Sequence, residues 1–135
     1  MRLTLAVLFS AAVLLVSCRE PSSRETFLRS DGSGEYAYDV EFKDSAAHYD
    51  LSFFSAIDRP VTAPDTVVSF PLDIVWRSPS GLFFSETVYY PAKERRVLYR
   101  SGVVPGETGV WHLSVSLGQE PTGLRGLGLI VEKMD

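Results

Sequence analysis

The sequence has a single cysteine and only two histidines among 135 residues, and this scarcity already excludes several kinds of site. One cysteine cannot form an internal disulfide or a zinc site built on paired cysteines. The chain contains neither an Asp-x-Asp-x-Asp-Gly calcium loop nor the Gly-x-Ser-x-Gly elbow of serine hydrolases. His48 and His112 each fall on the polar phase of an alternating segment, so we expect both to be exposed strand residues. We therefore expect no metal, no cofactor and no enzymatic activity.

The sequence also lacks an apolar run long enough to cross a bilayer. The run over 3–16 is shorter than the roughly 20 apolar residues that a membrane-spanning helix needs. It follows the positive charge of Arg2 and ends at the small residue Ser17, directly before Cys18. This is the layout of a secretory signal peptide.

The ending Leu15-Val16-Ser17-Cys18 resembles the lipobox of bacterial lipoproteins. In such proteins the cysteine thiol is acylated, the peptide is cut before it, and the new N-terminus is acylated as well. We accordingly expect residues 1–17 to be a lipoprotein signal peptide and Cys18 to carry the lipid, palmitate included, that anchors the protein to a membrane. The alternative is an ordinary signal peptide that ends near a free cysteine. Arg19 stands where an inner-membrane retention signal often has Asp, which favours the outer membrane of the cell envelope.

The chain has little excess charge, and the excess is negative. A formal net charge of −4 does not fit a nucleic-acid-binding protein, which concentrates basic residues on one face. The stretch 18–34 is polar, and its only apolar residues are Phe27 and Leu28. We expect a flexible tether over 18–34, with the alternative that Phe27 and Leu28 dock onto the folded domain as a short edge segment.

The remainder, 35–135, alternates between apolar and polar residues with the period of β-strands, and no window has a convincing helical pattern. We expect one antiparallel β-sandwich of about seven strands, of the general immunoglobulin or fibronectin type. The turn signal over 77–81 predicts that the strands on either side of it pair as a hairpin. The expected strands cover 35–42, 48–57, 66–76, 82–90, 95–101, 109–117 and 124–133.

Trp111 lies near the start of an expected strand, where an indole ring needs a partner for its N–H group. We predict that this N–H group donates to a backbone carbonyl of the preceding loop.

Adjacent aromatic residues supply the candidate contact surface. Successive residues of a strand point to opposite faces, so one member of each pair Phe53/Phe54, Phe83/Phe84 and Tyr89/Tyr90 must point away from the main core. The expected contact residues, for a protein partner or a glycan, are Phe84, Tyr90, Arg96 and Tyr99. Two simpler interpretations stay open: loops or the tether cover the aromatic rings, and the basic cluster 93–100 is the solvated face of an edge strand.

Five short segments of the mature chain form a recognisable set: Tyr49-Asp50-Leu51, Leu72-Asp73-Ile74, Glu86-Thr87-Val88, Gly109-Val110-Trp111 and Leu124-Arg125-Gly126-Leu127-Gly128-Leu129. With these segments the chain resembles the gliding-motility lipoprotein H family. The resemblance implies a small envelope lipoprotein that belongs to a bacterial machine for surface gliding and the associated protein secretion. It implies an accessory or scaffold role, other envelope proteins as partners, and no catalytic residue. The alternative is a carbohydrate-binding surface lipoprotein that uses the same aromatic residues as a stacking platform.

Overall fold

A computed structural model describes residues 22–58 and 69–134, in which eight strands form two antiparallel sheets. The expected signal peptide, Cys18 and the loop between Pro60 and Pro64 lie outside the described residues. Nothing in the described ranges forms a helix that is long and apolar enough to cross a membrane. The strands are β1 (Ser23–Arg29), β2 (Glu35–Phe42), β3 (His48–Ile57), β4 (Ser69–Arg77), β5 (Phe83–Pro91), β6 (Arg96–Val103), β7 (Gly109–Ser116) and β8 (Leu124–Met134).

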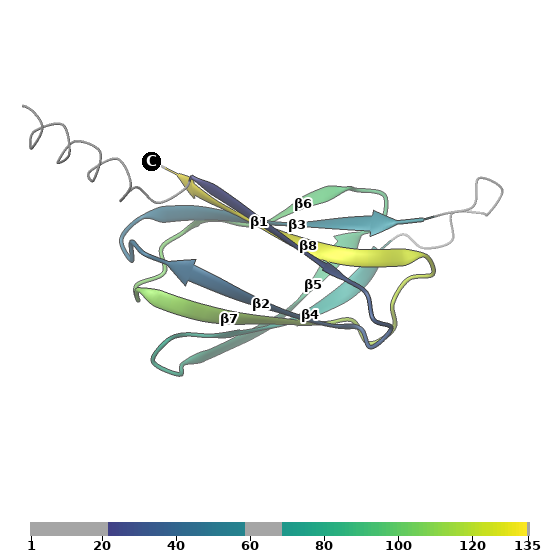
Figure 1. The fold of residues 1–135 in the computed structure, drawn as a ribbon, viewed down its shortest axis with the longest axis horizontal. Helices are drawn as coiled ribbons and strands as arrows, with labels where there is room; N and C mark the ends of the chain where they lie inside the picture. Colours follow the sequence, from purple (N-terminus) through teal and green to yellow (C-terminus); the bar gives the residue numbers. More distant parts are fainter. Residues whose placement is uncertain (1–21, 59–68, 135) are drawn as a thin grey trace, which may run out of the picture.

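The two sheets pack face to face as the layers of a sandwich (Figure 1). The first sheet has the order β1-β8-β3-β6 and the second the order β2-β7-β4-β5. Consecutive strands lie in opposite sheets, except that β4 and β5 pair as a hairpin. The expected all-β sandwich and its hairpin are thus confirmed. The strand order is that of an eight-stranded jelly roll, which differs from the connectivity of the immunoglobulin fold.

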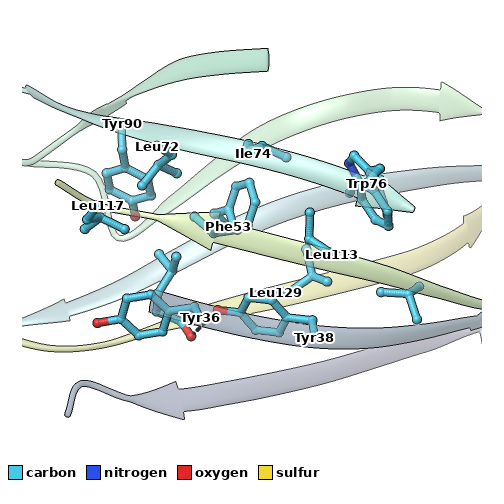
Figure 2. Close-up of a cluster of buried hydrophobic side chains, with 14 of the residues drawn as sticks. Tyr36, Tyr38, Phe53, Leu72, Ile74, Trp76, Tyr90, Leu113, Leu117 and Leu129 are labelled. Atoms are coloured by element: carbon cyan, nitrogen blue, oxygen red, sulfur yellow. Dashed lines mark hydrogen bonds between the residues drawn. The ribbon is translucent and has the colours of Figure 1, made fainter. Parts of the chain in front are cut away.

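Alternating side chains from both sheets build the core, as the sequence pattern predicts. In β2 every second residue is buried, and in β4 the same holds for Phe70, Leu72, Ile74 and Trp76. Figure 2 shows Tyr36 and Tyr38 of β2 and Leu72, Ile74 and Trp76 of β4 between the layers, together with Phe53 and Leu113 from other strands. Burial of one face per strand is the main favourable term for such a sandwich, because apolar area leaves water.

Pro71, which cannot donate to a ladder, lies in β4 beyond the end of its pairing with β7. That pairing begins at Asp73, so β4 has a neighbour on one side only at Pro71. The proline therefore occupies a local edge, where its missing N–H group interrupts no ladder.

The expected tether over 18–34 is wrong for the part that the structure describes. β1 pairs in register with β8, with Phe27 opposite Gly128 and Arg29 opposite Gly126. In Figure 1, β1 (purple) runs along β8 (yellow). The alternative, an edge segment, is therefore confirmed, and the sandwich begins at β1 rather than at residue 35.

Two glycines of β8 explain why this polar segment becomes a strand. A Cβ atom at Gly126 would overlap the ring of Phe27, and one at Gly128 would overlap the ring of Phe54. The glycines thus leave room for these two rings, which stack with centroids 5.7 Å apart. This contact joins β1 to β3 across β8, and no local pattern in 18–34 reveals it.

Buried tyrosine hydroxyls should make the fold sensitive to alkali. Burial raises the pKa of Tyr36 to about 12 and that of Tyr38, whose hydroxyl donates to the carbonyl of Leu127 at 2.6 Å, well above its ordinary range. Burial also raises the pKa of Tyr90 and Tyr99. The folded state therefore keeps these protons to higher pH than the unfolded chain, whose tyrosines titrate near 10.

We expect the contribution of these tyrosines to the free energy of unfolding to be constant up to about pH 9 and to fall as the pH rises from about 10 to about 12. Urea unfolding at a series of pH values measures it. Tyr38→Phe removes one of the ionisable groups, so this variant should be less stable at pH 8 yet lose less stability between pH 10 and 12. An equal loss in both proteins would contradict the assignment of the effect to this residue.

Candidate functional site

A cavity of about 690 Å³ opens between the two sheets on the side where the edge strands β5 and β6 lie. Its volume falls in the range typical of small-molecule and peptide side-chain sites. The lining comes from β2, β3, β4, β5, β6, β7 and the loop after β6. The residues are Phe42, Leu51, Trp76, Phe84, Tyr99, Arg100, Ser101, Gly102, Val103, Val104, Pro105 and Trp111.

Aromatic side chains form the inner part of this cavity. Trp76 and Trp111 meet edge to face with ring centroids 6.3 Å apart, and Trp111 meets Phe42 in the same way at 6.2 Å. The indole N–H of Trp76 donates to the hydroxyl of Tyr99 at 3.2 Å, and that of Trp111 donates to the carbonyl of Glu107 at 3.2 Å. The prediction for Trp111 is confirmed, since Glu107 lies in the loop before β7.

Charged groups lie at the mouth of the cavity and are bound to one another. The Arg100 guanidinium donates to both oxygens of the Glu86 carboxylate, with Nε–Oε1 at 3.2 Å and Nη2–Oε2 at 2.5 Å. The hydroxyl of Tyr99 donates to the same carboxylate. The guanidinium also lies 5.1 Å from the ring centroid of Phe84 and 5.6 Å from that of Tyr99. This network joins β5 to β6 across the open side of the sandwich.

Irregular pairing of β6 brings Tyr99 and Arg100 to the same carboxylate. In a regular strand adjacent side chains point to opposite faces. Here the register between β3 and β6 shifts twice, on either side of Leu51, and Gly102 within β6 has φ of +66°. Such bulges redirect side chains, and here two neighbours reach the cavity. Arg100 was not among the expected contact residues for this reason, although a lone glycine in a strand pattern is the signal of a bulge.

The electrostatics of the mouth suit binding better than proton transfer. Hydrogen bonds with the Tyr99 hydroxyl and the Glu86 carboxylate raise the pKa of Arg100, which stays cationic. Burial, followed by the hydrogen bond to Glu86, raises the pKa of Tyr99, so its hydroxyl stays protonated near neutral pH. A general acid or base needs a pKa near the working pH, and neither group has one. The arrangement offers an apolar recess with a neutralised ion pair at its entrance.

The structure brings together only two of the four expected contact residues. Phe84, 48% exposed, and Tyr99 both line the cavity. Arg96 lies away from it and pairs with Glu132 of β8. Tyr90 is 1% exposed and belongs to the core, so the prediction that it forms part of a contact surface is wrong. Its ring is the inward member of the Tyr89/Tyr90 pair and points between the sheets beside Leu72 and Leu117 (Figure 2).

Both histidines lie on the solvent side of the sandwich, as predicted. His48 is exposed, and His112 is half-exposed with its Nδ1 2.6 Å from Oδ1 of Asp39. Across residues 22–58 and 69–134, no group of three or more His, Cys, Asp or Glu side chains is arranged to hold a metal ion.

Comparison with known proteins assigns the chain to no family. No family model matches it, and no curated protein matches it either.

Proposed function

We propose that this protein is a lipid-anchored, non-catalytic binding module of the bacterial cell envelope, acting as an accessory or scaffold component of a machine for gliding motility and protein secretion. The supporting observation is the apolar cavity between β5 and β6, whose charged groups neutralise each other. The envelope location follows from the expected lipid on Cys18, and the machine from the resemblance of the mature chain to the gliding-motility lipoprotein H family.

The chemistry of the cavity favours an apolar segment of a protein partner as its occupant. Both indole N–H groups already have acceptors, and the guanidinium of Arg100 is already paired with Glu86. Filling the recess with an apolar or aromatic side chain removes apolar surface from water without breaking these bonds. A strongly polar ligand would have to compete with them.

The start of β1 supports a position of the domain close to the proposed lipid. Cys18 precedes Ser23, the first residue of β1, by five positions. Five extended residues reach at most about 18 Å. An acylated Cys18 would therefore hold β1 beside the membrane surface, whereas a tether as far as residue 34 would have allowed a longer reach.

A photo-crosslinking experiment in cells tests this proposal. We expect p-benzoylphenylalanine at Val104, which is half-exposed and lines the cavity, to capture a protein of the envelope. The same probe at Leu98, an exposed residue of β6 outside the cavity lining, is the matched control. Adding Phe84→Ala should reduce the capture at Val104, because it removes part of the cavity wall.

Two further readouts belong to the same experiment. Mass spectrometry of this protein, purified from the same cells, should show Cys18 acylated and N-terminal, and deletion of its gene should impair surface motility or secretion. An unmodified thiol on Cys18 would overturn the proposed lipid anchor. Equal capture at Val104 and Leu98 would overturn the cavity as the partner site.

Carbohydrate binding is the second candidate, and the aromatic lining of the cavity favours it. Faces of Phe84, Tyr99 and the two tryptophans could stack on sugar rings. Binding of the purified protein to a glycan array that Phe84→Ala abolishes, combined with no protein captured at Val104, would place this candidate first.

A further inference from the structure

β5 differs from the other edge strands of the sandwich in carrying no charge on its outward side. Natural sheets protect their edges with charged residues, prolines and bulges. The outward side chains of β5 are all uncharged, and the two aromatic ones are the most exposed: Phe83 at 72% and Tyr89 at 70%. The outward side chains of the other edges include Glu25 and Arg29 in β1, Glu35, Asp39 and Glu41 in β2, and Arg96 in β6, which also has a bulge.

The backbone of β5 is oriented to accept another strand. Ser78 N–H donates to the carbonyl of Leu82 at 2.9 Å, so these two residues form a hydrogen-bonded pair at the base of the hairpin. Such pairs recur at every second residue of an antiparallel ladder. The even-numbered residues of β5 therefore bond to β4, and Ser85 and Thr87 direct their N–H and C=O groups outward at the edge of the sheet.

We propose that β5 pairs antiparallel with β5 of a second copy of this chain, extending the second sheet across a two-fold axis at Glu86. The outward side chains run Phe83, Ser85, Thr87, Tyr89, which is an aromatic residue, two small hydroxyl residues and an aromatic residue. In this register Phe83 faces Tyr89 of the second copy, and Ser85 faces its Thr87. Aromatic pairs and Ser–Thr pairs are favourable partners across strands.

The ion pair between Arg100 and Glu86 offsets the repulsion that two Glu86 carboxylates would have at the two-fold axis. Glu86 would face its own counterpart, and opposed like charges destabilise a sheet. Each carboxylate is already bound in bidentate fashion by Arg100 of its own chain. A shift to the next symmetric register would centre the pairing on Thr87, placing Tyr89 opposite Ser85 and losing both aromatic pairs.

Disulfide trapping in the cell envelope tests the register with the full chain. Ser85→Cys combined with Thr87→Cys should give a disulfide-linked dimer, because facing residues of a hydrogen-bonded pair have Cα atoms about 5.5 Å apart, within disulfide range. Each single variant should give at least tenfold less disulfide-linked dimer. In this register Ser85 faces Thr87 of the second copy, so two cysteines at the same position lie diagonally across the ladder and farther apart. The unsubstituted chain reports any link through Cys18, its only cysteine.

The opposite edge of the same sheet supplies the matched control. Ala37→Cys with Asp39→Cys places the same spacing on β2, and this variant should not form the dimer. A dimer formed equally by the β2 pair or by the single variants would overturn the proposal. Capture of a different protein by the β5 cysteines in place of the second copy would overturn it as well.

Sedimentation of the lipidated protein in detergent gives an independent measurement. We expect a mass of two copies, and at least tenfold weaker self-association for Thr87→Lys, because two lysines would be brought beside the axis. Thr87 is exposed and lies opposite Asp73, so a lysine there need not disturb the fold. Ala37→Lys on β2 should leave the dimer unchanged, and a single-copy mass for the unsubstituted protein would overturn the proposal.

Discussion

Replacing Tyr90 with alanine is expected to lower the free energy of unfolding by about 3–5 kcal/mol, the cost of emptying a large aromatic site in a core. The ring is 1% exposed and stacks on Phe70 with centroids 5.0 Å apart. Its hydroxyl lies 2.7 Å from the carbonyl oxygen of Glu94 and 3.0 Å from that of Arg95. These contacts tie β5 to the turn that leads into β6, so the loss affects both sheets.

The neighbouring residue provides the control for Tyr90. Tyr89 has the same side chain but points outward, so at protein concentrations low enough to keep the chain monomeric Tyr89→Ala should change the free energy of unfolding by no more than about 0.5 kcal/mol. Tyr90→Phe keeps the ring and removes only the hydroxyl, for which we expect a loss of about 1 kcal/mol. Urea unfolding measures all three variants. Similar losses for Tyr89→Ala and Tyr90→Ala would contradict the assignment of Tyr90 to the core.

Gly34→Ala is expected to lower the free energy of unfolding by about 3 kcal/mol or more. Three effects add up: the strain of a side chain in the left-handed backbone region, a steric overlap and a weakened hydrogen bond. Gly34 has φ of +78°, and an added Cβ would overlap the backbone carbonyl oxygen of Leu117. The two backbones cannot separate freely, because Leu117 N–H donates to the carbonyl of Gly34 at 2.8 Å.

Gly32 is the control that separates backbone strain from the steric effects at Gly34. Its φ of +86° is similar, but an added Cβ would meet no atom within 4 Å. Gly32→Ala should therefore show the backbone strain alone, about 1–2 kcal/mol. Urea unfolding of both variants gives the steric part by difference, and equal losses would show that the approach of Gly34 to Leu117 does not constrain the fold.

Local alternation explains why seven of the eight strands could be predicted. β2 and β7 alternate apolar and polar residues except at the outward Ala37 and Val110, and each buries one side. This pattern depends only on the strand period and on the gain from burying apolar area, so it can be read in a single segment. The position of the β4–β5 hairpin follows in the same way from the turn residues between the two strands.

β1 and the strand order could not be predicted, because both depend on residues far apart in the chain. β1 has few apolar residues, and Phe27 finds its place only where Gly126 and Gly128 of β8 leave room for aromatic rings. The jelly-roll connectivity likewise depends on which strand edges meet, and alternation within one strand says nothing about that.

The side chains of the candidate site, too, could be predicted from the sequence only in part. The sequence indicated an excess of aromatic residues in β5 and selected Phe84 and Tyr99, which both line the cavity. It selected Tyr90 wrongly, since a pair such as Tyr89/Tyr90 shows that one ring points outward but not which one. It missed Arg100, because the bulges of β6 turn this side chain toward Glu86.

The sequence by itself determined an all-β sandwich, the position of most strands, the inward residues of the strands that alternate regularly, and the bond made by the Trp111 indole. Only the tertiary structure decided the order of the strands, the inclusion of β1, the cavity between β5 and β6, and the uncharged edge of β5. The physical reason is that strand formation follows from the period of neighbouring residues, whereas edges, bulges and cavities follow from contacts between segments that the chain brings together from a distance.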